Sequence, residues 1–440
     1  EQSAGIISEK VTEICTLVPA FEREIDRRPG KTREGKDYVK YVFKNGSYFD
    51  NIAANEKSRG KRRHGFVGEE CVGIDDTILR EVIIPVMAVS RRAKDAMVAY
   101  LEGRFAHAVT AAKLNELFAW GDGLRKTAAK MFNADAEEIF FSHGASEMIN
   151  VFSAGVELKE NANVIVTGLT FPSTPYTWVN RVGEENVRMV LPENYAIPFE
   201  KLVEQVDENT AVISLCLVEN TTGFMHDLKK ISAFCQEKGI YLALDITQCV
   251  GAMKIDVKET PVDFIATSSF KWLGCEYGTG IGYVSRRVMD QVKPVFVGWV
   301  GNQNRMDHSR YHLNLAETAA KYETAIPNWV GLKGLEQAME IYLELGIDDV
   351  DAYIRELMDY LYAEAAKVEQ ISIRGNFAPE NRSSIAYIDM PAEWGMNDDI
   401  LEANGIRAHM SGTAIRVALH YFNNKADVDR LITFLKNYKG

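Results

Sequence analysis

The chain has 440 residues, more than a single hydrophobic core usually holds, so we expect two or three domains. Its hydrophobic and charged fractions, 46% and 25%, are those of a globular protein, and a net charge of −12 argues against a nucleic-acid partner. The absence of an apolar run of bilayer length, of a signal-peptide pattern and of any CxxC pair among the six cysteines predicts a cytoplasmic protein without a membrane partner, a disulfide framework or a metal site.

The first 87 residues differ in charge from the rest of the chain. They contain fifteen basic and fifteen acidic residues, so the whole net charge of −12 is carried by residues 88–440. The change falls near VIIPVMAVSRRAKDAM, residues 82–97. We therefore treat residues 1–87 as an appended segment.

The next part, residues 88–334, predicts a large α/β domain. It begins with a helical pattern from VSRRAKDAM onward, and amphipathic segments such as DLKKISAFCQEKG then separate short apolar runs. The runs predicted to be strands are EEIFFS, NVIVTG, TAVISLCLV, IYLALDITQ, VDFIATSS and GIGYVS. Because they are apolar throughout and alternate with helices, we expect a mostly parallel sheet that lies between helices.

The last part, residues 335–440, predicts a small C-terminal α+β domain. Two long helical stretches, GLEQAMEIYLELG and DDVDAYIRELMDYLYAEAAKV, come first. The strands ISIRG, SSIAYIDM and TAIRVALHY come next, and the helix NKADVDRLITFLKNYK ends the chain.

Several polar or aromatic residues stand where the predicted strands end, and ligands bind at that edge of a parallel sheet. They are Ser146 at a helix start, Phe171, Asn220, Asp245, Gln248, Ser268 and Lys271. Each has an ordinary explanation by itself: a capping serine, a core ring, a turn former or a solvated lysine. Together they supply an anion site, a carboxylate, an aromatic ring and an amine, which is the set that a phosphorylated pyridine aldehyde needs.

The ordered pair ALDITQ and SSFKWLG…GTG resembles the class V (fold type I) aminotransferases, a family of pyridoxal-phosphate (PLP) enzymes that includes cysteine desulfurases. The resemblance covers about four fifths of the chain, from residue 88 or so to the end. It implies the PLP-dependent transferase fold, the cofactor pyridoxal 5′-phosphate, an amino-acid substrate and a homodimer.

The resemblance also implies a role for each site residue. Lys271 forms the Schiff base and moves the substrate proton, Asp245 pairs with the pyridinium nitrogen, and Gln248 approaches the ring hydroxyl. Phe171 stacks on the ring, and Asn220 lies beside cofactor and substrate. The phosphate is held by Ser146 and Ser268 with the backbone of Gly144 and Ala145. Arg416 in AIRVALHYFNN binds the substrate α-carboxylate.

Departures from the family pattern concern the substrate and the dimer. The segment GIRAHMSGTAIR lacks the desulfurase cysteine, and Phe270 replaces a frequent histidine. In YETAIPN, Ile326 replaces a threonine that reaches the neighbouring subunit's phosphate. Transamination, C–S lyase or desulfurase-like elimination and racemisation therefore stay open, with transaminase or C–S lyase chemistry favoured. For His143, His409 and His420 we favour structural roles over proton transfer.

Residues 1–87 resemble part of the ATPase domain of phage terminase large subunits, through the acid-ended strand HGFVGEE and the basic loop SRGKRRHG. RPGKT offers only the tail of a phosphate-binding loop, so we expect no nucleotide site and favour a fused fragment. The alternatives that remain open are a DNA-packaging ATPase-related protein and a catalytically impaired fusion.

Overall fold

The computed structural model describes Ile25, Arg28, residues 33–34, 39–42 and 48–50, and residues 89–440 apart from 108 and 310. The chain divides into two compact units, Glu1–Met87 and Ala88–Gly440. In the first, β1 (Arg33–Glu34), β2 (Val39–Val42) and β3 (Tyr48–Asp50) pair as an antiparallel sheet. The segments that resemble a terminase, HGFVGEE and SRGKRRHG, lie outside the described residues, so that interpretation stays a prediction.

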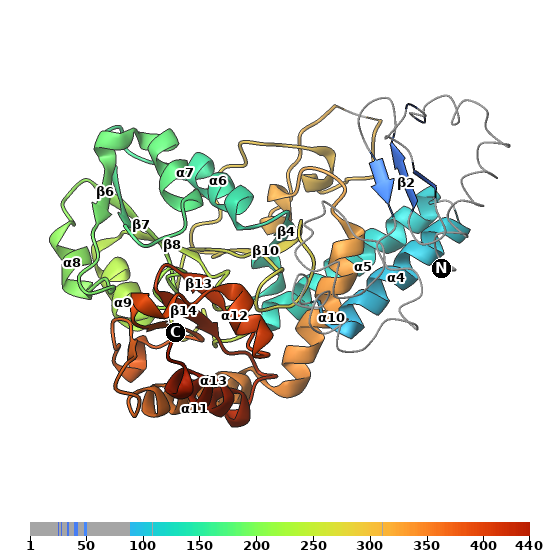
Figure 1. Cartoon of the computed structure of the whole chain (residues 1–440). Helices are drawn as coiled ribbons and strands as arrows, with labels where there is room; N and C mark the ends of the chain where they lie inside the picture. The colour runs from blue at the N-terminus through green and yellow to red at the C-terminus, as the bar shows by residue number, and fades with distance from the viewer. Residues whose placement is uncertain are drawn as a thin grey trace. The chain divides into compact units, whose positions relative to one another are not determined.

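The second unit alternates helices and strands along most of its length (Figure 1). Its helices are α4 (Arg91–Ala106), α5 (Ala111–Lys130), α6 (Ala145–Gly155), α7 (Ser173–Val182), α8 (Phe199–Glu204), α9 (Leu228–Lys238), α10 (Trp329–Leu345), α11 (Ile347–Ala365), α12 (Asp398–Ala403) and α13 (Lys425–Asn437). Its strands are β4 (Ile139–Ser142), β5 (Asn163–Thr167), β6 (Val187–Val190), β7 (Thr210–Cys216), β8 (Tyr241–Asp245), β9 (Phe264–Ala266), β10 (Gly280–Val284), β11 (Ser372–Ile373), β12 (Ile385–Asp389), β13 (His409–Ser411) and β14 (Ala414–Ala418).

The large sheet has the order β4-β10-β9-β8-β7-β5-β6. The pairs from β9 to β6 are parallel, and β10 is antiparallel to both of its neighbours. The predicted mostly parallel sheet is therefore confirmed. The sequence pattern did not predict the edge strand β6, because its segment VRMV is only partly buried and lacks the unbroken apolar run of the central strands.

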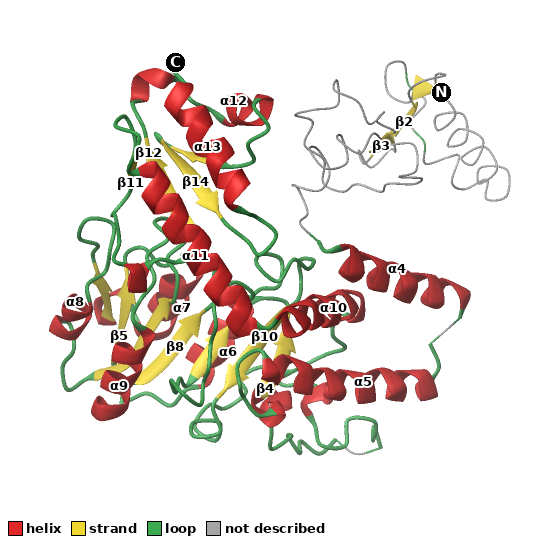
Figure 2. Cartoon of the chain, turned by 90° about the horizontal axis from the view of Figure 1, so that it is seen from below, coloured by secondary structure: helices red, strands yellow, loops and turns green. Residues whose placement is uncertain are grey.

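Helices cover both faces of this sheet (Figure 2). Alternate residues of one strand enter different cores: in β8, Leu242 and Leu244 join the core that contains residues of α5, α9 and α10, whereas Ala243 joins the core that contains residues of α6 and α7. Successive side chains of a strand point to opposite faces, and each large aliphatic side chain contributes about 1.5–3 kcal/mol when fully buried. Burial on both faces thus explains why these strands are apolar throughout.

The glycines of β10 are required by close packing. A Cβ atom on Gly282 would lie 2.2 Å from the Phe140 ring, and one on Gly280 would lie 2.1 Å from the carbonyl oxygen of Thr267. The strand can therefore approach β4 and the end of β9 only without side chains at these two positions. Gly280 thus packs against Thr267, which lies in the segment between β9 and Lys271.

A buried ion pair joins α5 to the segment after β10. The Arg125 guanidinium lies 2.5 and 2.9 Å from the two carboxylate oxygens of Glu323, and one of these oxygens also accepts a 2.8 Å hydrogen bond from the Phe141 N–H. Bidentate geometry and the extra donor compensate the two charges for the loss of water. The pair fixes the start of YETAIPN against β4.

The C-terminal part forms an antiparallel sheet with the order β11-β12-β14-β13, against which α11 and α13 lie (Figure 2). The predicted small α+β domain is therefore present. The predicted boundary at residues 334/335 falls inside α10, which packs on α4 and α5, and the exact domain limits stay a prediction. Among the described residues no helix is long and apolar enough to cross a membrane.

Candidate active site

A buried carboxylate stands at the carboxyl end of β8. Asp245 is 7% exposed and lies directly opposite Cys216 in the parallel ladder with β7. Its Oδ1 accepts a 2.8 Å hydrogen bond from the Thr247 N–H. Burial raises the pKa of Asp245, and the hydrogen bonds from Thr247 and the charge of Lys271 oppose that rise. A cation beside this carboxylate would favour its ionised form.

Lys271 lies in the turn after β9 and is partly buried. Burial lowers the pKa of its amine, and the positive charge of Arg416 lowers it further, while Asp245 and Cys216 act in the opposite direction. The structure thus brings Lys271 within electrostatic reach of Asp245 and Arg416. A lowered pKa raises the share of neutral amine, the form that attacks a carbonyl or accepts a proton.

The start of α6 forms a cradle with the segment after β9. The Ala145 N–H donates to Ser268 Oγ at 3.0 Å, and a Cβ atom on Gly144 would lie 2.9 Å from that same oxygen. Ser146 Oγ lies 2.6 Å from Ser173 Oγ at the start of α7. Hydroxyls and the N–H groups of a helix terminus bind anions such as phosphate. The structure adds Ser173 to the residues that the sequence suggested.

Phe171 and Gln248 are each joined to this region by one hydrogen bond. The Phe171 N–H donates to Cys216 Sγ at 3.4 Å, which places the segment after β5 over the end of β7, and its ring is 47% exposed. Gln248 is buried, and its Oε1 accepts a 3.3 Å hydrogen bond from Trp272 Nε1. Gln248 is thereby joined to the residue directly after Lys271.

The small domain contributes Arg416 from β14. The positive charge of Arg416 acts on Lys271 and lowers the pKa of its amine. Across the sheet, Arg416 pairs in register with Tyr387 of β12, whose hydroxyl donates to the Asn220 carbonyl oxygen at 2.7 Å. Within the described part of the chain, Asn220 Oδ1 is buried without a hydrogen-bond partner. A buried acceptor without a partner suits a ligand group.

The pattern of apolar strands did not reveal a second buried carboxylate, Glu219. Its Oε1 accepts a 2.6 Å hydrogen bond from Thr167 Oγ1 and lies 2.9 Å from His226 Nε2. The charge of Glu219 adds to the rise of the Asp245 pKa. The sequence contains one indication of this residue, because Glu219 stands directly before Asn220 at the end of the apolar run LCLVEN. A charged residue at a buried strand end needs partners.

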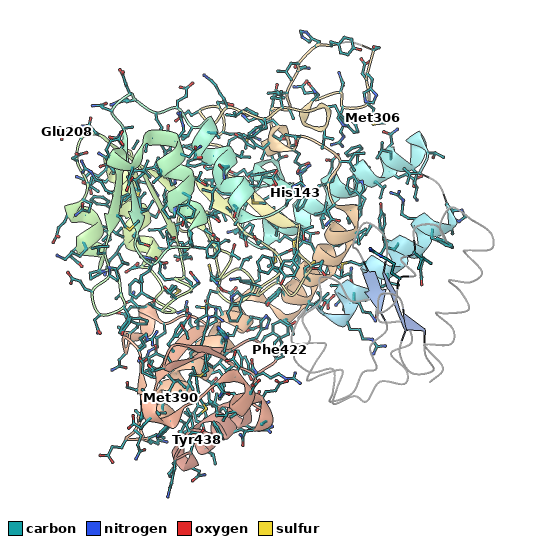
Figure 3. All side chains as sticks on the ribbon, turned by 45° about the horizontal axis from the view of Figure 1, so that its top comes forward. His143, Glu208, Met306, Met390, Phe422 and Tyr438 are labelled. Carbon is teal, nitrogen blue, oxygen red and sulfur yellow. The ribbon has the colours of Figure 1, made fainter. Side chains whose placement is uncertain are left out.

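The three histidines occupy different environments. His143 and His409 are exposed and pair with Glu147 and Asp398, and Figure 3 shows His143 where β4 leads into α6. His420 instead stacks on Trp272, with ring centroids 5.4 Å apart, and its Nε2 lies 2.9 Å from the Trp272 carbonyl oxygen.

The Tyr342 hydroxyl donates to the same Trp272 oxygen at 2.5 Å. The peptide after Lys271 is thus held by His420 from the segment after β14 and by Tyr342 from α10.

We expect His420 to make stability depend on pH, because burial lowers its pKa from 6.5 to about 4. Between pH 6.5 and pH 4 the imidazole of His420 is protonated in the unfolded chain but stays neutral in the folded protein. The free energy of unfolding is therefore unaffected by His420 above pH 6.5, and it decreases by about 3 kcal/mol at most as the pH falls toward 4. Urea unfolding at a series of pH values should show a flatter profile for His420→Asn than for the wild type. His409→Asn is the control, and equal slopes for wild type and His420→Asn would contradict this role.

Comparison with known proteins identifies the family of the chain. Residues 95–431 match the family model described as aminotransferase class-V. An uncharacterized aminotransferase of Schizosaccharomyces pombe is 27% identical over 354 residues, 75% of this chain and 88% of that protein. A probable cysteine desulfurase of Methanothermobacter thermautotrophicus is 24% identical over 336 residues, 72% of this chain and 83% of that protein.

Among solved structures, the C-DES protein with glycine covalently linked to its PLP cofactor superimposes with a TM-score of 0.71 at 16% identity, over 81% of this chain and 96% of that one. The predicted fold type I architecture is thus confirmed, whereas the terminase interpretation of residues 1–87 gains no support. The match extends over most of the chain, and the protein belongs to the class V aminotransferase family of pyridoxal-phosphate-dependent enzymes.

Proposed function

We propose that this protein acts on an amino acid through PLP bound covalently to Lys271, with transaminase or C–S lyase chemistry. The observation that carries the proposal is the convergence of the Lys271 amine, the buried Asp245 carboxylate and Arg416 at one end of the large sheet. The buried Asn220 Oδ1, which has no hydrogen-bond partner among the described residues, and the cradle at the start of α6 fit a cofactor with a ring and a phosphate.

Each residue has a task that its position suits. The phosphate would be held by Ser146, Ser268 and the first N–H groups of α6, the ring by Phe171, and the ring nitrogen and hydroxyl by Asp245 and Gln248. When bound, PLP supplies an electron sink that weakens the bonds at the substrate Cα.

The remaining steps belong to the protein's own side chains. Arg416 would bind the substrate carboxylate by two hydrogen bonds and so orient Cα toward Lys271. Once the substrate amine has taken its place on the cofactor, Lys271 Nζ would be free to accept the Cα proton and return it, and the lowering of its pKa favours the neutral amine that this needs.

The cysteines support the preference for a transaminase or C–S lyase over a desulfurase. In the described part of the chain all four cysteines, Cys216, Cys235, Cys249 and Cys275, are buried, and burial raises the pKa of each thiol. A persulfide carrier must attack as an accessible thiolate. The segment 405–416 before Arg416 also offers no cysteine. The C-DES protein is described as a cystine C–S lyase in a second structure, which supports the lyase alternative.

We predict that Lys271→Ala abolishes the visible absorption band of the lysine-linked cofactor after reconstitution with PLP, since no other amine would replace Nζ at that position. Lys254→Ala, which removes an exposed lysine paired with Asp348, is the matched control and should keep the band. Survival of the band in Lys271→Ala would refute the assignment.

We further predict that iodoacetamide treatment of the folded enzyme leaves turnover of amino-acid substrates unchanged, because the reaction proposed needs no protein thiolate.

Product analysis distinguishes transamination from C–S cleavage. A keto acid formed only with an amino acceptor indicates transamination, and a keto acid with ammonia and sulfide indicates C–S cleavage. Loss of sulfide release after alkylation would favour a desulfurase instead.

We also propose that the protein forms a homodimer. Val295, Phe296 and Val297 are consecutive and 53%, 65% and 49% exposed, and Ile326 in the YETAIPN segment is 50% exposed. Contiguous exposed apolar side chains mark surfaces that bind a partner.

We predict that analytical ultracentrifugation shows a dimer that Phe296→Asp shifts toward monomer, because a charge would be buried in the interface. The control Leu191→Asp alters a single leucine that is 69% exposed and should have no effect. A monomeric wild type would exclude this proposal.

A further inference from the structure

One tyrosine lies between the two residues proposed to contact the substrate. Tyr387 belongs to β12 in the small domain, and its hydroxyl donates to the carbonyl oxygen of Asn220 in the large domain at 2.7 Å. Its strand neighbour in register is Arg416. The family resemblance assigned no role to this position, and the sequence pattern shows it only as one residue of an apolar strand.

Arg416 lies beside Tyr387, because directly paired residues of neighbouring strands project from the same face of the sheet. Burial raises the pKa of Tyr387, and the charge of Arg416 acts in the opposite direction. The hydroxyl therefore stays protonated at neutral pH. It can give its hydrogen to Asn220 and accept one from the guanidinium, as a phenol both donates and accepts.

The ring of Tyr387 is itself held in place. It is 3% exposed, and the Arg374 guanidinium lies 5.2 Å from its centroid. Arg374 is fixed in turn by two hydrogen bonds to Asp389, of 2.6 and 3.1 Å, in the same strand as Tyr387. A side chain that is packed and hydrogen-bonded in this way can fix the rotamer of its neighbour.

We propose that Tyr387 is a positioning residue that holds Arg416 at a set distance from Asn220, so that the α-carboxylate of an amino-acid substrate meets a pre-oriented guanidinium. This inference rests on the proposed function, because it assigns Arg416 to the substrate carboxylate. Tyr387 itself does not contact the reacting atoms. Without its hydroxyl, Arg416 would have to be ordered by the substrate, at a cost in affinity.

A purely structural tie between the two domains would leave a different signature. Loss of such a tie would lower stability and weaken every ligand alike, whereas loss of an oriented guanidinium weakens only ligands that carry a carboxylate. The comparison therefore needs two ligands that differ in that group alone.

The experiment uses Tyr387→Phe, which keeps the ring and its contact with Arg374 and removes only the hydroxyl. Binding to the PLP-loaded enzyme is followed by the spectral change of the cofactor, first with an amino-acid substrate and then with the amine that lacks its carboxylate. Tyr438→Phe is the matched control, since it removes a small-domain hydroxyl that donates to the Trp394 carbonyl oxygen at 3.2 Å.

We expect Tyr387→Phe to raise the dissociation constant and KM for the amino acid about tenfold, with the amine unaffected and kcat little changed. Tyr438→Phe should behave as the wild type toward both ligands. In an Arg416→Lys background, the additional loss from Tyr387→Phe should largely disappear, because the two side chains act as one unit.

The outcomes separate this inference from the proposed function. If the wild type binds cofactor and amino acids, and Tyr387→Phe weakens both ligands equally or neither, the positioning role is overturned while the proposed function stands. If the two substitutions are additive, the role is overturned as well. A wild type that binds no PLP would overturn both.

Discussion

The central strands of the large sheet are buried on both faces, and the rest of the molecule depends on this constraint. With helices packed above and below, β5, β7, β8 and β9 carry mostly apolar residues along their length. Polar side chains are therefore found mainly at the strand ends. Because parallel strands end on one edge, Thr167, Cys216 and Asp245 meet there.

Charge at that edge is balanced by neighbours that come from distant parts of the sequence. Burial alone would drive Asp245 toward its neutral acid and Lys271 toward its neutral amine. Each moderates the shift of the other, and Arg416 adds a positive charge that favours the neutral amine. A buried site can thus hold a reactive amine and an ionisable carboxylate together, where either alone would bear the full desolvation cost.

The small domain is joined to this edge at two places. His420 and Tyr342 hold the peptide after Lys271 through the Trp272 carbonyl oxygen, and Tyr387 binds the Asn220 carbonyl oxygen beside Arg416. Both contacts use neutral groups that donate hydrogen bonds to backbone oxygens. Burying a neutral polar group costs less free energy than burying an ion. The positions of the amine and of the guanidinium are therefore set by the same packing of the two domains.

The sequence by itself determined the α/β class, the mostly parallel sheet and the candidate residues at strand ends, because apolar runs and their polar ends are local patterns. It did not reveal β6, whose edge position leaves it only partly apolar. Ser173, Glu219 and Tyr387 also stayed hidden. Their importance comes from partners that lie far away in the chain: Ser146, His226 and Asn220. Only the tertiary structure decides such contacts, since a hydrogen bond depends on distance in space and not on spacing along the sequence.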